Sequence, residues 1–147
     1  MDGVVVKQLP RFADPRGWLT ELFRSDELPE GFEPTMGYIS VTRPGVARGP
    51  HEHVEQSDGF AFVSGHFMLY LWENRPGKGD ASAVIDVGEE NPVFVIVPPG
   101  VVHAYRNAGD ADAFVLNFPD RLYKGRGKKE PVDEIRHEDD PGSRFKL

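Results

Sequence analysis

The sequence contains no cysteine among its 147 residues, which excludes disulfide bonds, thiol nucleophiles and thiolate metal ligands. No apolar run approaches the roughly 20 residues that a membrane-spanning helix requires, and the chain does not begin with a basic segment followed by a long apolar one. We therefore expect a cytoplasmic protein that does not enter a membrane. Positive charge is also scarce. The 17 Lys and Arg against 24 Asp and Glu give a net charge of −7, which argues against nucleic-acid binding.

Sustained helical periodicity is absent too, and Asp26–Pro29 is compatible with one helical turn at most. What the chain does contain is a series of short runs rich in Val, Ile, Phe and Tyr, most of them bounded by Gly, Pro or Asn. The runs are Gly37–Val41, Phe60–Val63, Phe67–Trp72, Ala83–Val87, Val93–Val97 and Ala113–Phe118. This pattern predicts one all-β domain over residues 1–147, a barrel or a double-sheet jelly roll. The charged stretch Lys124–Leu147 is expected to be a surface tail that can fold back across the barrel mouth.

Four polar side chains stand out against this apolar background. His51 and His53 are two residues apart, so on a strand they point to the same side of a sheet, where Asp58 and His103 can converge with them. Three imidazoles and one carboxylate suit Zn, Fe, Mn or Ni, with positions left open for water or substrate. The same groups also suit a metal-free acid–base site, or a hydrogen-bonded lining of a solvated pocket. The residue types alone leave these alternatives open.

The spacing of the residues around this cluster narrows the range of possible folds. The pattern G-x5-H-x-H-x4-D-x6-G spans Gly45–Gly65, and P-x-G-x2-H-x3-N spans Pro98–Asn107. Together they resemble the two motifs of the cupin superfamily, with Asp58 where a glutamate is usual. The resemblance implies a cupin-type double-stranded β-helix. In it we expect the first motif to form a hairpin with inward histidines, and the second to bring His103 from a facing strand.

Further motifs extend the resemblance over most of the chain, from about Leu9 to Pro141. They are Phe12–Arg24, Ser40–His51, Gln56 with Phe60–Gly65, Val97–His103, Leu122–Lys124 and Asp133–Pro141. In this order they resemble the dTDP-4-dehydrorhamnose 3,5-epimerase family, whose substrate is a nucleotide-linked 4-keto-6-deoxysugar. The resemblance also implies a homodimer with exchanged N-terminal strands, and it requires no cofactor.

Catalytic roles follow from the same resemblance. His51 is expected to be the base that removes the protons next to the C4 ketone, and a carboxylate near the C-terminus is expected to orient it. Asp140 is the first choice for that carboxylate and Asp139 the second. Tyr123 is expected to return a proton to the opposite face of the sugar. The expected substrate-binding residues are Arg48, Phe23, Arg24, Gln56 and His103, with Phe23 and Arg24 reaching the nucleotide of the neighbouring subunit.

The chain departs from the epimerase pattern at several positions. Where the family carries a lysine two residues after the glutamine, Gln56 is followed here by Ser57 and Asp58, so a cation has become an anion. His53 restores the H-x-H of metal-binding cupins and of the related 3,4-ketoisomerases. The substrate-facing Gln and Asn of the preceding strand are Met36 and Tyr38, and the longer tail of typical epimerases is missing.

These departures leave two alternatives for the cluster, a metal site and an acid–base site. A metal held by His51, His53, Asp58 and His103 could stabilise an enolate, but it would occupy the lone pair that His51 needs as a base. The base would then be another group, such as His103 or Tyr123. The leading hypothesis is 3,5-epimerisation in deoxysugar and surface polysaccharide synthesis. The alternatives are a metal-binding cupin that acts as a 3,4-ketoisomerase, or a non-catalytic module that binds a sugar nucleotide.

Overall fold

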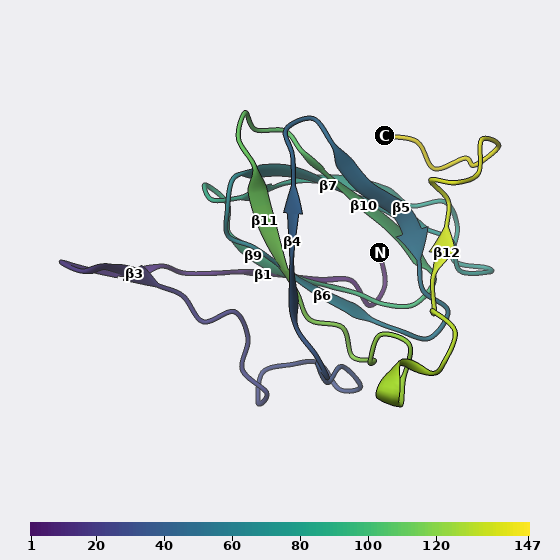
Figure 1. Ribbon diagram of the computed structural model, residues 1–147, viewed down its shortest axis with the longest axis horizontal. Coiled ribbons are helices and arrows are strands. Elements are labelled where there is room, and N and C mark those ends of the chain that lie inside the picture. Colours follow the sequence, from purple (N-terminus) through teal and green to yellow (C-terminus); the bar gives the residue numbers. More distant parts are fainter.

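The computed structural model describes residues 1–147 and consists of two antiparallel five-stranded sheets that face each other (Figure 1). The first sheet has the order β1 (Val5–Gln8), β9 (Val93–Val97), β6 (Asp58–Phe62), β11 (Ala113–Asn117) and β4 (Tyr38–Thr42). The second has the order β12 (Ile135–Arg136), β5 (Ala47–Glu52), β10 (Val101–Asn107), β7 (His66–Glu73) and β8 (Ser82–Gly88). The prediction of an all-β jelly roll is confirmed.

Outside the two sheets lie a separate hairpin and one short helical turn. The hairpin, β2 (Phe12–Asp14) and β3 (Gly17–Leu19), projects well beyond the sheets at the left of Figure 1. The 3-10 turn η1 covers Arg126–Lys128. Asp26 to Pro29 form a turn rather than a helix. The structure contains no helix with the length and apolar character needed to cross a membrane.

All six predicted runs are strands, with ends shifted by one or two residues, but the predicted arrangement of the two motifs is wrong. β5 and β6 do not form a hairpin, because β5 pairs with β10 and β12 while β6 pairs with β9 and β11. His103 does not come from a facing strand, since β10 is the neighbour of β5 and His103 stands opposite His51 in the register. The facing sheet contributes Asp58 instead.

The hydrophobic core fills the space between the sheets. Its residues alternate along β7, where Phe67, Leu69 and Leu71 point inward, as expected for a strand with one buried face. Tyr105 of β10 packs edge-on against Phe62 and Phe67. A second cluster covers part of the outer face of the first sheet, and its buried members are Leu9, Phe32, Ala61, Phe94 and Ile96. Because both of their faces are covered, β6 and β9 are buried along their whole length.

A glycine in β5 allows the close approach that positions the histidines. Gly49 has a φ of 83°, and a Cβ atom there would lie 2.5 Å from the carbonyl oxygen of His103. The ladder between β5 and β10 shifts register between His103 and Tyr105, which marks a bulge at this point. A larger residue would push the two strands apart, and with them His51 and His103.

The carboxyl-terminal stretch Lys124–Leu147 is more than a surface tail. It supplies β12, which pairs with the edge of β5, and Phe145, which is 6% exposed and packs against Trp72. The buried carboxylate of Glu52 accepts hydrogen bonds from Asn74 Nδ2 at 2.7 Å and His137 Nε2 at 2.8 Å. The segment is therefore integrated into the second sheet beside the histidines.

One ion pair of the fold has a measurable dependence on pH. The buried carboxylate of Glu73 accepts hydrogen bonds from Arg75 Nε at 2.8 Å and from the Arg75 backbone N–H at 3.0 Å, and these bonds lower the pKa of Glu73 to about 2. The stabilisation is complete above the unfolded pKa of 4.5 and is lost as the pH falls toward 2. We expect Glu73→Gln to lower the free energy of unfolding at pH 7 by about 1 kcal/mol.

The measurement is urea unfolding of the wild type and Glu73→Gln at pH 7 and pH 3, with the exposed Glu90→Gln as the control. The difference between wild type and Glu73→Gln is expected to shrink at pH 3. An equal difference at both pH values would contradict this account.

Candidate functional site

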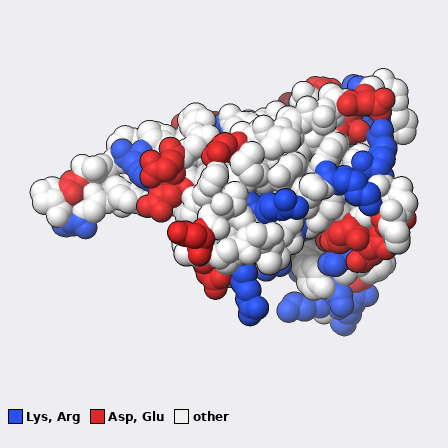
Figure 2. Space-filling view, turned by 90° about the horizontal axis from the view of Figure 1, so that it is seen from above, with Lys and Arg blue, Asp and Glu red and all other residues white.

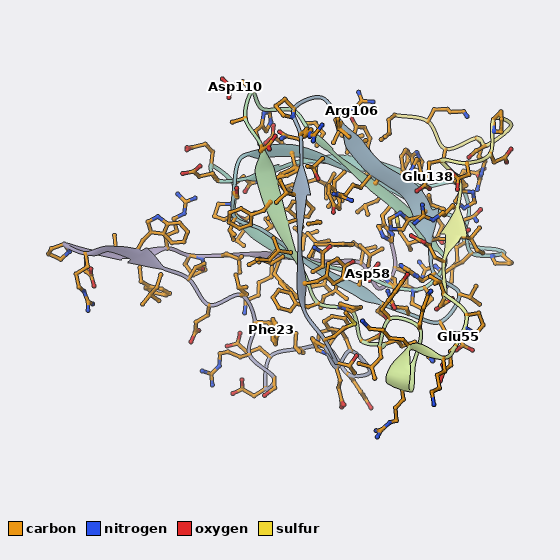
Figure 3. All side chains as sticks on the ribbon, viewed as in Figure 1. Phe23, Glu55, Asp58, Arg106, Asp110 and Glu138 are labelled. Carbon is orange, nitrogen blue, oxygen red and sulfur yellow. The ribbon has the colours of Figure 1, made fainter.

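The structure brings His51, His53, Asp58 and His103 together at one end of the space between the sheets. His51 and His103 lie on neighbouring strands of the second sheet, His53 follows the end of β5, and Asp58 begins β6 of the facing sheet. One ligating atom from each of the four lies within 4.8 Å of all the others. Figure 3 shows Asp58 pointing into the middle of the barrel. The convergence predicted from the spacing is present, although the strands that achieve it differ.

Asp58 is the buried anion of this cluster. Its Oδ2 lies 3.0 Å from His53 Nε2 and 3.3 Å from His103 Nε2, and its Oδ1 accepts a hydrogen bond from Gln56 Nε2 at 2.8 Å. Burial raises the pKa of Asp58, but the two imidazoles outweigh burial and hold that pKa below its usual range. Burial likewise lowers the pKa of His53, yet the contact with Asp58 dominates and raises it to about 9. Without a metal, these two residues form a buried ion pair.

His51, in contrast to the protonated His53, is uncharged. Burial, reinforced by His103 and His53, lowers the pKa of His51 to about 2, so its imidazole is neutral at neutral pH. Its Nδ1 lies 3.7 Å from Glu134 Oε1 and 4.0 Å from Glu138 Oε1. Both carboxylates come from the carboxyl-terminal segment, where Arg136 stands opposite His51 in the register of β12 and β5.

These contacts correct the prediction that Asp140 orients His51. The carboxylate of Asp140 accepts a hydrogen bond from the backbone N–H of Gly142 and closes a local turn. Neither Asp139 nor Asp140 is within 4 Å of His51 or lines the cavity. The sequence carries no signal for Glu134 and Glu138, because their place beside His51 depends on the pairing of β12 with β5.

Asp133 anchors the same segment to the turn after β5. Its carboxylate accepts hydrogen bonds from the backbone N–H groups of Val54, Glu55 and Gln56 at 2.9, 2.9 and 2.8 Å. Its backbone carbonyl accepts a hydrogen bond from His53 Nδ1. That bond fixes the orientation of the His53 ring and directs Nε2 toward Asp58. The motif Asp133–Pro141, which resembles the epimerase family, begins with Asp133 but does not indicate this role.

A cavity of about 1480 Å³ opens above the cluster, which is large for a small-molecule site. Of the predicted residues, His51, His53, Asp58, Arg48, Gln56 and Tyr123 line it, as do Met36 and Tyr38. Arg48 is held by its Nε hydrogen bond to Thr42 Oγ1 at 3.1 Å and by its Nη2 hydrogen bond to the Val41 carbonyl at 2.7 Å. His103 is 1% exposed and does not line the cavity, so its predicted contact with substrate is not supported.

Phe23 and Arg24 lie away from this cavity. The ring of Phe23 packs against Phe94 and Phe118 with centroids 5.4 and 5.3 Å apart, and Figure 3 shows it far from Asp58. Phe23 is therefore packed against the second hydrophobic cluster, and its contact with the nucleotide of a neighbouring subunit stays a prediction. Arg24 pairs locally with Asp26 at 2.9 Å. A role for Arg24 in a neighbouring subunit stays a prediction.

The donor set of the cluster fits a divalent transition metal. His103 Nε2 is buried and has no hydrogen-bond partner, because its approach to Asp58 is poorly aligned. An unpartnered buried nitrogen is uncommon in folded proteins and is often explained by an unobserved ion or water. Three imidazole nitrogens and a carboxylate oxygen at this spacing are ligands typical of Zn, Fe, Mn or Ni.

Comparison with known proteins places the chain among proteins of polysaccharide synthesis. Residues 12–129 match the family described as the polysaccharide biosynthesis C-terminal domain. A probable low-salt glycan biosynthesis epimerase of Haloferax volcanii is 35% identical over 124 residues, which is 82% of this chain and 79% of the relative. The spore coat polysaccharide biosynthesis protein SpsL of Bacillus subtilis is 36% identical over 127 residues, or 84% and 82% of the two chains.

Solved structures share the fold at lower identity. A dTDP sugar isomerase from Desulfovibrio desulfuricans superposes with a TM-score of 0.82 and 21% identity, covering 99% of this chain and 90% of that one. A dTDP-6-deoxy-D-glucose-3,5-epimerase from Legionella pneumophila, in complex with dTDP-4-keto-L-rhamnose, superposes with a TM-score of 0.79 and 19% identity. The match covers 92% of this chain and 73% of that one. At these identities the likeness establishes the architecture.

Proposed function

This chain belongs to the polysaccharide biosynthesis C-terminal domain family, and on that premise we propose that it is an isomerase that epimerises a nucleotide-linked 4-keto-6-deoxysugar. The name of its Haloferax relative, a glycan biosynthesis epimerase, supports this class of reaction. The observation that carries the proposal is His51, a neutral imidazole on the wall of a large cavity, with two glutamates facing its Nδ1. We assign the product to surface polysaccharide synthesis, and the predicted cytoplasmic location stays a prediction.

The chemistry requires a base beside an acidified carbon. The C4 ketone makes the protons on C3 and C5 removable, and a neutral imidazole in hydrogen-bond reach can take them. Glu134 and Glu138 lie near His51 Nδ1 but beyond hydrogen-bond distance, and we assign them the role of orienting the ring, since a carboxylate that closes on Nδ1 leaves Nε2 to face the sugar. Tyr123, on the same cavity, is assigned the return of a proton from the other face.

The enolate formed by proton removal needs positive charge or hydrogen-bond donors near its oxygen. Asp58 stands where the related epimerases carry a lysine, so that source of charge is missing. Arg48 lines the cavity without a carboxylate partner, and we assign it to the substrate near the developing charge. Gln56, whose amide already binds Asp58, completes this side of the cavity.

The first test is exchange of solvent deuterium into dTDP-4-keto-6-deoxyglucose. We expect wild-type protein to label C3 and C5, and His51→Asn to reduce labelling at least 100-fold, because a general base contributes about 10²- to 10⁴-fold. Affinity for dTDP should change less than three-fold. Labelling at C3 alone with a 3-keto product would identify a 3,4-ketoisomerase, and no labelling with tight dTDP binding would identify a non-catalytic module. Turnover retained in His51→Asn would remove this residue as the base.

The role of Glu134 in orienting His51 can be tested against a matched control variant in the same segment. Glu134→Gln is expected to slow the exchange about ten-fold, because the amide no longer favours the correct tautomer. Asp140→Asn, which makes the same chemical change six residues later, should stay within two-fold of wild type. The reverse ranking would restore Asp140 as the partner of His51.

A second candidate, a metal-binding cupin, is favoured by the unpartnered nitrogen of His103. His51, His53, Asp58 and His103 would hold the ion. When bound, it would supply Lewis-acid stabilisation of an oxyanion. In that state the lone pair of His51 is a metal ligand, and proton removal passes to another group, for which Tyr123 lines the same cavity.

Elemental analysis of untagged protein tests this candidate directly. It predicts one Zn, Fe, Mn or Ni per chain, lost in His53→Ala and retained in His66→Ala, a surface histidine paired with Asp86 at 2.9 Å. It also predicts that a chelator lowers the unfolding temperature of the wild type but not that of His53→Ala. Wild type without bound metal would leave His51 as the base and remove the candidate.

We further assign the active form as a homodimer built through the projecting hairpin. Trp18 and Leu19 on β3 are 49% and 59% exposed, and Ile39 and Val41 on the edge strand β4 are 64% and 52% exposed. Exposed apolar side chains on a projecting arm and on an open sheet edge are typical of a surface covered by another chain. The second copy of this chain is the partner that supplies both surfaces at once.

The dimer predicts a mass in solution of twice the chain's 16.4 kDa by light scattering. Trp18→Asp combined with Leu19→Asp should shift the protein to the monomer, because a charge is costly in an apolar interface. Val84→Asp, a change of the same kind at an exposed position of β8, should not. A monomeric wild type would overturn the assignment.

A further inference from the structure

The acidic residues that line the cavity are almost all neutralised or bonded. Asp58 contacts two histidines, Asp133 accepts three backbone N–H groups, and Asp120 accepts the backbone N–H of Ser57 at 2.9 Å. The remaining pairs are Glu55 with Arg121 at 3.1 Å, Glu134 with Arg136 at 2.9 Å and Glu138 with Arg136 at 3.9 Å. Glu130 alone has no such partner. Most of these acidic residues therefore have a partner within the protein, although Asp120 and Asp133 keep their charge because their donors are neutral backbone N–H groups.

Three basic residues of the same cavity wall, in contrast, have no carboxylate partner. Lys124, Arg126 and Lys128 line the cavity, and none of them has a carboxylate within 4 Å. They alternate with two glycines in the five-residue stretch Lys124–Lys128, which we call the basic loop. Even with Glu130 counted, the loop carries an excess of positive charge inside a chain whose net charge is −7. Figure 2 shows Lys and Arg side chains next to Asp and Glu side chains at the end of the molecule opposite the projecting hairpin. Local cations of this kind attract an anion despite the overall field.

The backbone of the basic loop is also unusual. Lys124 and Lys128 have φ values of 57° and 58°, and they are the only non-glycine residues of the chain with positive φ. Gly125 and Gly127 adopt the same sign at 64° and 72°. Left-handed backbone at lysine is unfavourable, and such residues cluster where a ligand is held.

This conformation turns several backbone donors outward. The loop is closed by the hydrogen bond from Glu130 N to the Lys124 carbonyl at 2.9 Å and from Lys128 N to the Gly125 carbonyl at 3.2 Å. The N–H groups of Lys124, Arg126 and Gly127 have no acceptor within the protein. Successive free N–H groups in mixed left- and right-handed backbone form a concavity that binds anions. The carboxylate of Glu130 packs against Gly125 of the loop, so an anion bound by these donors has to displace that carboxylate.

We propose that the basic loop, Lys124–Lys128, is the subsite that binds the diphosphate of the nucleotide sugar. This inference rests on the proposed function, which puts the sugar between His51 and Tyr123. Tyr123 directly precedes the loop, and the diphosphate is attached to the sugar, so the two binding groups follow each other in the chain as they do in the ligand. Lysine and arginine donate charge-assisted hydrogen bonds to phosphate oxygens, and the free N–H groups add to them.

Calorimetric titration with dTDP and with thymidine tests the subsite in the full-length protein. We expect the double variant Arg126→Gln with Lys128→Gln to bind dTDP about ten-fold more weakly and thymidine unchanged, because only dTDP carries the diphosphate. The dTDP affinity of the double variant should also depend less steeply on salt than that of the wild type. Lys124→Gln, made separately, should act in the same direction.

The control is Arg43→Gln with Lys146→Gln, which removes the same charge from exposed positions outside the cavity and should leave dTDP affinity unchanged. Equal dTDP affinity in wild type and in both loop variants would overturn the subsite. So would an equal loss in the control, since net charge alone would then explain it.

Kinetic measurements distinguish a failure of the subsite hypothesis from a failure of the proposed function. If the wild type epimerises the sugar, the double variant should raise KM by about ten-fold and change kcat less, as expected for binding remote from the reacting carbons. Wild type that epimerises with a KM unaffected by the loop variants would overturn the subsite and keep the function. Wild type that binds dTDP through the loop but exchanges no deuterium would overturn the function and keep the subsite.

Discussion

The candidate site depends on the hydrogen bonds by which Asp133 joins the carboxyl-terminal segment to the turn after β5. A carboxylate that accepts three backbone N–H groups is strongly held, and its burial costs little because each oxygen is satisfied. The same residue orients His53 through its carbonyl. From this anchor, β12 runs along β5 and places Glu134 and Glu138 beside His51. One residue far from the histidines in sequence therefore anchors the segment that contacts two of them.

Both sheets contribute side chains to the cluster. The second sheet supplies His51 and His103 in register, and the first supplies Asp58 from the opposite wall. The resulting contact of Asp58 with His53 leaves one histidine protonated and another neutral within one small volume. Groups whose environments drive their pKa values apart are typical of sites that move protons. Both of these histidines, the neutral His51 and the protonated His53, line the cavity.

Much of this arrangement could be predicted from the sequence, for identifiable reasons. Alternating apolar runs and turn residues located the central strands, and motif spacing identified the four residues of the cluster. Periodicity shows which side chains share a face, but not which sheet a strand joins, so β5 and β6 were wrongly paired as a hairpin. The carboxyl-terminal segment escaped prediction because polar bonds rather than apolar periodicity hold it. Asp140 and Phe23 were assigned from the family resemblance, which does not show the local turn of Asp140 or the packing of Phe23 against Phe94.

The pairing of β12 with β5 also bears on how the chain folds during synthesis. The two strands are separated by most of the chain, as are β1 and β9, so the contact order is high and folding is expected to be slow. Until the ribosome has added residues near the end of the sequence, β5 has an open edge that can pair with another chain. The segment that completes the site thus also covers the edge of β5, and the chain is exposed to aggregation until that segment has been synthesised.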